Sequence, residues 1–121
     1  MSPRRYVPSH HPDRALFRVE FPFGQRPRAR WNTVDYDVLD ISEKGIRLNN
    51  EGLQRFAAGA SVRLGVKFED AVVTVTGRVL RANERETVIA LSEGFSLERV
   101  RREERRLIRG DEPGSSITGE R

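Results

Sequence analysis

The chain has 121 residues and a formal net charge of +4, with 36% of its residues hydrophobic and 33% charged. This length is sufficient for one domain with a single modest core, and the absence of cysteine excludes disulfides and thiolate metal sites. No apolar run approaches the length of a membrane span and no secretory signal is evident, so we expect a cytoplasmic protein without membrane insertion.

The two ends of the chain have the composition of irregular segments. Residues 1–13 contain three prolines and show no hydrophobic periodicity, which predicts a flexible N-terminal arm. His10 and His11 lie in this arm without a third metal-ligating residue at a suitable spacing, so the sequence does not indicate a metal site. Residues 110–121 are predicted to form a disordered tail.

Between these ends, segments with alternating or β-branched apolar residues predict six strands. They cover residues 28–32, 34–41, 45–50, 61–68, 71–82 and 87–91. Because most of the connections are short turns rather than helical crossovers, the predicted fold class is all-β, a six-stranded antiparallel β-barrel over about residues 26–92.

A C-terminal α-helix is predicted over about residues 96–109. Ser96 is a suitable N-cap and Gly110 is placed to end the helix. The apolar residues expected near one face are Leu97, Val100, Leu107 and Ile108.

The strand predicted at residues 34–41 reverses its alternation partway. The apolar residues are first Val34, Tyr36 and Val38, and then Leu39 and Ile41. Such a reversal requires a β-bulge near Val38 or a strand that packs on both faces. If the second apolar pair turns inward, Asp40 and Ser42 lie on the outer surface.

Two short motifs carry the polar residues with a chemical interest. "RALFR" places Arg14 and Arg18 four residues apart ahead of the first strand, and "DISEKG" places Asp40, Ser42 and Gly45 around a tight turn. Each motif also has an ordinary structural interpretation. The two arginines can be surface residues, and the second motif can be a turn in which the Asp and Ser side chains bond to backbone amides. No phosphate-binding loop or nucleophile arrangement accompanies them, so nothing indicates an enzyme.

In this order, R-x-x-x-R followed by D-x-S-x-x-G at a hairpin resembles the PilZ domain family. The resemblance extends from Arg14 to Arg109 and includes "RVEFPF" after the second arginine, "GIRL" after the turn, the six strands and the closing helix. It implies a PilZ domain over residues 14–109 with a PilZ-type barrel.

PilZ domains bind the bacterial second messenger cyclic di-GMP, so the resemblance implies a cyclic di-GMP receptor or adaptor with no other cofactor. The implied ligand-binding residues are Arg14, Arg18, Asp40, Ser42 and Gly45. Arg81, at the end of the long strand, is a possible further ligand-binding residue. The alternative interpretation is an arginine that is simply exposed to solvent. The expected output is contact with an unidentified protein partner in the control of motility, biofilm or polysaccharide.

Two other functions stay open. The first is a PilZ-like adaptor that binds no nucleotide and acts only through protein interaction. The second is a basic barrel that binds nucleic acid, which the scarcity of aromatic residues disfavours. The sequence does not decide whether the closing helix forms a homodimer.

Overall fold

The structure, a computed structural model, describes residues 17–53 and 56–110. The predicted arm at residues 1–13, with His10 and His11, lies outside the described residues, as do Arg14 and residues 111–121.

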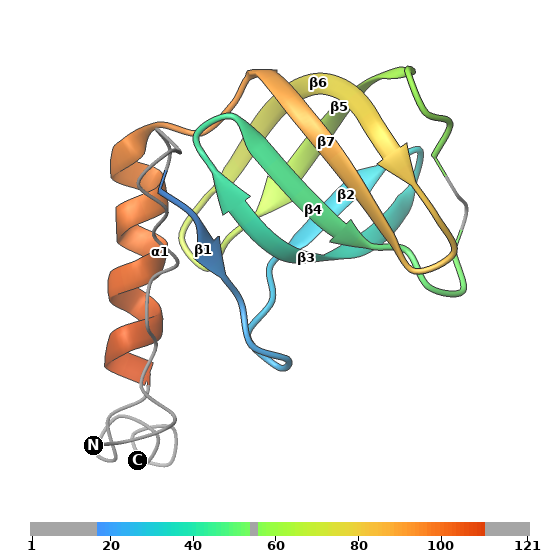
Figure 1. Cartoon of the computed structure of the whole chain (residues 1–121). Helices are drawn as coiled ribbons and strands as arrows, with labels where there is room; N and C mark the ends of the chain where they lie inside the picture. Colours follow the sequence, from blue (N-terminus) through green and yellow to red (C-terminus); the bar gives the residue numbers. More distant parts are fainter. Residues whose placement is uncertain (1–16, 54–55, 111–121) are drawn as a thin grey trace.

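Seven strands and one helix make up the described chain (Figure 1). The elements are β1 (Val19–Glu20), β2 (Arg28–Trp31), β3 (Val34–Ser42), β4 (Gly45–Asn49), β5 (Ser61–Lys67), β6 (Val72–Ala82), β7 (Glu86–Glu93) and α1 (Leu97–Gly110). Strands β2 to β7 form a closed ring in the order β3-β2-β5-β6-β7-β4, and β4 pairs with β3 to close it. Every pairing is antiparallel, which confirms the predicted six-stranded barrel with a C-terminal helix.

Strand β3 is the element that positions the site, because it pairs with three other strands. One edge pairs with β4, and the other pairs first with β2 and then with the short β1. The pairing with β4 skips Leu39, since Val38 lies opposite Leu48 whereas Asp40 lies opposite Arg47. The reversed alternation in the sequence is therefore a β-bulge at Leu39, one of the two explanations predicted above.

The barrel interior is filled by apolar side chains from every strand of the ring. Examples with no exposed surface are Ala29, Tyr36, Val38, Ile41, Leu48, Val66, Val75 and Ile89. Because the side chains of a strand alternate, this inward row leaves most polar residues of the strands on the outside of the barrel. Thr87 in β7 is an exception: it is buried and accepts a hydrogen bond from the Asn50 side-chain amide at 3.0 Å.

Helix α1 covers one end of the barrel beside β1 and β3 (Figure 1). The Ser96 hydroxyl accepts a hydrogen bond from the Arg99 amide at 3.0 Å, which confirms the predicted N-cap. The predicted apolar face is wrong in part: Val100 and Leu107 are buried, but Leu97 and Ile108 are about 40% exposed. The helix turns a different stripe toward the barrel, and that stripe includes a carboxylate.

That carboxylate belongs to Glu103, which is 1% exposed. Arg99 donates to it at 3.1 Å and Arg106 at 3.0 Å, so the buried charge is paired on both sides. Arg99 also donates to Asp70 in the β5–β6 turn at 2.8 Å and lies 4.7 Å from the Phe68 ring centre. These contacts connect α1 to the barrel by charge as well as by apolar packing.

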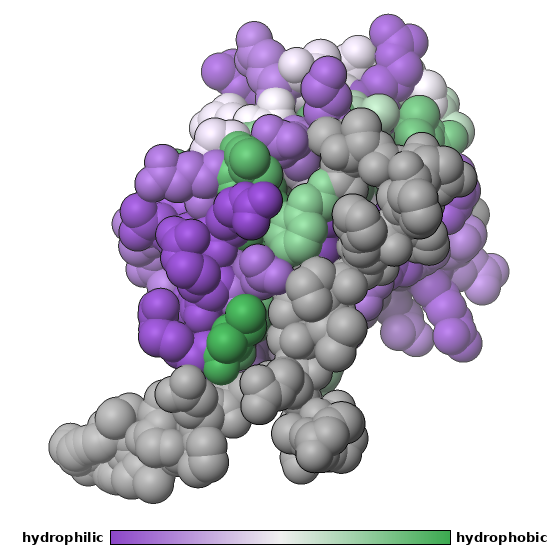
Figure 2. All heavy atoms as spheres, turned by 60° about the vertical axis from the view of Figure 1, so that its left-hand side comes forward, coloured by the Kyte–Doolittle hydropathy of each residue, from purple (hydrophilic) through white to green (hydrophobic). Residues whose placement is uncertain are grey.

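The molecular side that carries α1 is mostly hydrophilic over its described surface, with hydrophobic residues only in small separate areas (Figure 2). In the part of the chain that the structure describes, no helix combines the length and the hydrophobicity that crossing a membrane requires.

Gly77 in β6 is required by the close approach of β7. A Cβ at this position would collide with the Ala90 carbonyl oxygen, which is backbone and cannot move without breaking the ladder. We therefore expect Gly77→Ala to lower the free energy of unfolding by about 2–3 kcal/mol, measured by urea denaturation. Gly65→Ala is the matched control, because its Cβ would make an ordinary 3.9 Å contact with Val72; a similar loss in both variants would contradict this reason.

Candidate functional site

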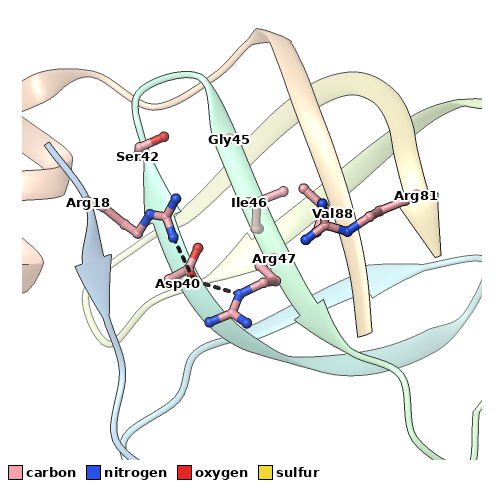
Figure 3. Close-up of a pocket in the computed structure, with 8 residues that line it drawn as sticks. All are labelled: Arg18, Asp40, Ser42, Gly45, Ile46, Arg47, Arg81 and Val88. Carbon is pink, nitrogen blue, oxygen red and sulfur yellow. Dashed lines mark hydrogen bonds and ion pairs between the residues drawn. The ribbon is translucent and has the colours of Figure 1, made fainter. Parts of the chain in front are cut away.

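A polar pocket of about 390 Å³ lies on the outer surface of the barrel where β3, β4 and β7 meet the lead-in to β1 (Figure 3). Its lining residues are Arg18, Asp40, Ser42, Gly45, Ile46, Arg47, Arg81 and Val88. This volume is within the range of small-molecule sites in proteins. The pocket therefore brings together Arg18 of the first motif and all three singled-out residues of the second.

Arg18 reaches the pocket because β1 pairs with the end of β3. Val19 lies opposite Ile41 and Glu20 opposite Asp40, so continuing this register places Arg18 across from Ser42. Its Nη1 atom is 3.8 Å from Oδ2 of Asp40. The first motif is thus held against the second by backbone pairing as well as by charge.

Asp40 lies on the outer side of β3 but is only 5% exposed, since guanidinium groups lie over it. Arg47 Nε donates to its Oδ2 atom at 2.7 Å, and Arg18 approaches the same atom. The sequence predicts a carboxylate standing open on the barrel surface, whereas the structure has one beneath two arginines. The reason is that the hairpin register sets Arg47 directly opposite Asp40.

Arg47 also connects this carboxylate to the next strand. Its Nη1 atom donates to Glu86 Oε1 at 2.7 Å, so one guanidinium joins β3, β4 and β7. Its side chain is 32% exposed, on the floor of the pocket rather than in the barrel interior.

The charges of this cluster affect one another. Burial raises the pKa of the Asp40 carboxyl above its usual value, and the hydrogen bond from Arg47 and the charges of Arg47 and Arg18 oppose this rise without cancelling it. For Arg47, burial acts to lower the pKa, but the contacts with Asp40 and Glu86 outweigh it and the pKa is raised. Arg47 is therefore a permanent cation.

Ser42 and Gly45 are paired residues at the two ends of the β3–β4 turn. A Cβ on Gly45 would lie 3.3 Å from the Ser42 hydroxyl, tighter than most such contacts. The absence of a side chain at Gly45 leaves the hydroxyl and the adjacent backbone accessible to a flat group in the pocket.

Arg81 comes from the far side of the pocket. The pairing of β6 with β7 skips Leu80, and Arg81 then lies opposite Val88, which also lines the pocket. In Figure 3 the guanidinium groups of Arg18 and Arg81 extend toward β4 from opposite sides.

Sequence reasoning missed Arg47, Glu86, Ile46 and Val88. A signal for Arg47 was present, because a hairpin that pairs Ser42 with Gly45 sets Asp40 near Arg47 on the neighbouring strand. Glu86 and Val88 are more than forty residues away from the motif and depend on the pairing of β4 with β7. Arg14 is outside the described residues.

In chemical terms the pocket presents three guanidinium groups, a carboxylate, a hydroxyl and an open glycine backbone. Arginine binds phosphate and the acceptor edge of guanine, and a carboxylate accepts from the guanine donor edge. The arrangement suits an anionic ligand that also carries hydrogen-bond donors.

The sequence model of the PilZ domain matches residues 12–110. The chain belongs to the PilZ domain family. PilZ domains are generally cyclic di-GMP-binding and adaptor domains, and the family is not a typical enzyme family.

Among solved structures, this PilZ domain is similar to the crystal structure of an uncharacterized Legionella protein, Lpg0364. The two share 15% sequence identity with a TM-score of 0.52, over 75% of this chain and 92% of that chain. At this identity the likeness concerns the fold alone. No curated protein matches the chain at a significant level.

Removing the Arg47 guanidinium leaves Asp40 buried with one distant partner and Glu86 without its donor. We expect Arg47→Ala to lower the free energy of unfolding by about 2–4 kcal/mol, because uncompensated buried charges are costly. Chemical denaturation at neutral pH measures this loss. Arg63→Ala, at an exposed position in β5, is the control and should change stability by less than about 0.5 kcal/mol; equal losses would show that Arg47 acts only as a surface residue.

Proposed function

We propose that this PilZ domain is a receptor for cyclic di-GMP that signals through contact with another protein. The observation that carries the proposal is the shared pocket, since residues from two motifs separated by more than twenty positions line one small-molecule-sized site. Cyclic di-GMP has two phosphates and two guanines, which match the guanidinium and carboxylate groups there.

Arg18 is proposed to contact the ligand directly. Its contact with Asp40 is 3.8 Å, longer than a hydrogen bond, so this contact can be exchanged for one with a phosphate or a guanine edge. Asp40 is proposed to accept from guanine while it keeps the 2.7 Å bond to Arg47, because a carboxylate can accept about four hydrogen bonds. Ser42 and Gly45 would border the guanine, and Arg14 and Arg81 would add cations around it.

Titration calorimetry with cyclic di-GMP tests this proposal. We expect Arg18→Ala, Arg14→Ala and Asp40→Ala each to weaken binding by about 10–100-fold, the effect of losing one bidentate contact. The matched controls are Arg63→Ala and Asp35→Ala, which alter exposed strand residues outside the pocket and should bind normally. If the intact protein releases no heat at about 100 µM ligand, the adaptor that binds no nucleotide is the correct function.

The raised pKa of Asp40 predicts how binding depends on pH. The ionised carboxylate is the form that accepts from guanine, and a raised pKa means that this form is lost at a higher pH than for an ordinary aspartate. Affinity should therefore fall as the pH is lowered from about 7.5 to about 5, as measured by calorimetry. Asp40→Asn should bind cyclic di-GMP more weakly at neutral pH, and its affinity should depend less on pH. If the affinities of the variant and the unaltered protein depend on pH in the same way, Asp40 does not contact the ligand.

A further inference from the structure

The half of the barrel that faces away from the pocket carries its own charge pattern. In the closed ring of six strands, β5 is diametrically opposite β4, β2 is opposite β7, and β6 is opposite β3. Figure 1 shows β4 and β7 in front of the barrel and β2 and β5 behind them. Side chains on the outside of β2 and β5, and of β6 over residues 72–78 where it pairs with β5, therefore point away from the pocket. Arg81, at the other end of β6, lines the pocket instead.

Five exposed cations lie on this half, which we call the basic face. They are Arg28 and Arg30 on β2, Arg63 and Lys67 on β5, and Arg78 on β6. The strand registers bring them together, because Arg28 lies opposite Lys67, Arg30 opposite Gly65, and Ser61 opposite Arg78. No outward position of β5 or β6 within this register carries a carboxylate.

The positive charge of the basic face is incompletely compensated. Arg28 and Arg30 pair with Asp37 and Asp35 at its β3 edge, at 3.2 and 3.1 Å. Within the described residues, Arg63, Lys67 and Arg78 make no ion pair or side-chain hydrogen bond.

This pattern opposes the stability of the sheet. Like charges directly opposite each other in an antiparallel pair, such as Arg28 and Lys67, are destabilising. The chain neutralises buried charges elsewhere, as Arg47 does for Asp40. An anionic partner on the basic face would supply the missing compensation.

The spacing and chemistry of the face favour an array of phosphates. Its cations are distributed along the seven residues of β5, about 20 Å, instead of converging on one point. The outward residues of these three strands include no aromatic ring on which a nucleobase could stack. Val72, which lies opposite Lys67, is 66% exposed and adds an apolar contact at one end.

We propose that the basic face binds the surface of an anionic phospholipid bilayer without inserting into it. Lysine and arginine near a membrane surface are attracted to anionic headgroups, and an exposed apolar side chain strengthens interfacial binding. Bound in this way, the protein would present the pocket on β3, β4 and β7 to the side opposite the membrane. The proposal does not depend on the identity of the pocket's ligand.

Sedimentation with vesicles tests the proposal, using the full chain with no nucleotide present. At about 50 mM salt we expect binding to vesicles with 30% phosphatidylglycerol in phosphatidylcholine, none to pure phosphatidylcholine, and release at about 500 mM salt. Each cation removed should weaken binding about fivefold, so Arg63→Gln, Lys67→Gln and Arg78→Gln together should weaken it on the order of a hundredfold. Thermal unfolding of the triple variant verifies that it is folded.

The control is a triple variant with the same change in net charge at other exposed positions: Lys44→Gln, Arg85→Gln and Arg105→Gln. It should retain most of the binding. The proposal is overturned if the intact protein ignores anionic vesicles, if both triple variants lose binding equally, or if a 30-base-pair DNA duplex captures the protein at a lower phosphate concentration than the vesicles do.

Discussion

One extra residue in β3 is the constraint on which both the core and the pocket depend. Val38 points into the barrel, and strict alternation would also send Asp40 inward, where an unpaired carboxylate costs several kcal/mol. The bulge at Leu39 allows Ile41 to enter the core and Asp40 to lie outside. The irregularity that satisfies the interior therefore also creates the polar surface of the site, and β1 then brings Arg18 to that surface.

In the part of the chain that the structure describes, arginines pair with two nearly buried carboxylates. Asp40 lies between Arg18 and Arg47 at the pocket, and Glu103 lies between Arg99 and Arg106 on the inner side of α1. Replacing such pairs by apolar residues is often neutral or stabilising, so their contribution is better understood as orientation than as stability. At the pocket the two arginines hold the Asp40 carboxylate in one position, which the proposed binding of a ligand there would require.

The alternation of apolar and polar residues predicted the barrel strands closely. The predictions were incomplete or wrong where the structure depends on contacts between residues far apart in the sequence. The turn from Ser42 to Gly45, the cap at Ser96 and the six barrel strands follow from short stretches of sequence. The two-residue β1 is too short to give a periodic signal. The helical periodicity of the sequence places Leu97 and Ile108 on an apolar face. In the structure α1 buries Glu103 instead, because Arg99 and Arg106 neutralise the Glu103 carboxylate.

The sequence by itself determined the family, the fold class and the motif residues, because the order of two short motifs and the alternation within each strand can be recognised without knowledge of tertiary contacts. Only the tertiary structure decided that Arg18, Asp40 and Arg81 share a pocket, that Arg47 covers Asp40, and that five cations gather on the opposite half of the barrel. The physical reason is ring closure: which side chains become neighbours depends on strand order and register, and these are set by pairing between segments far apart in the chain.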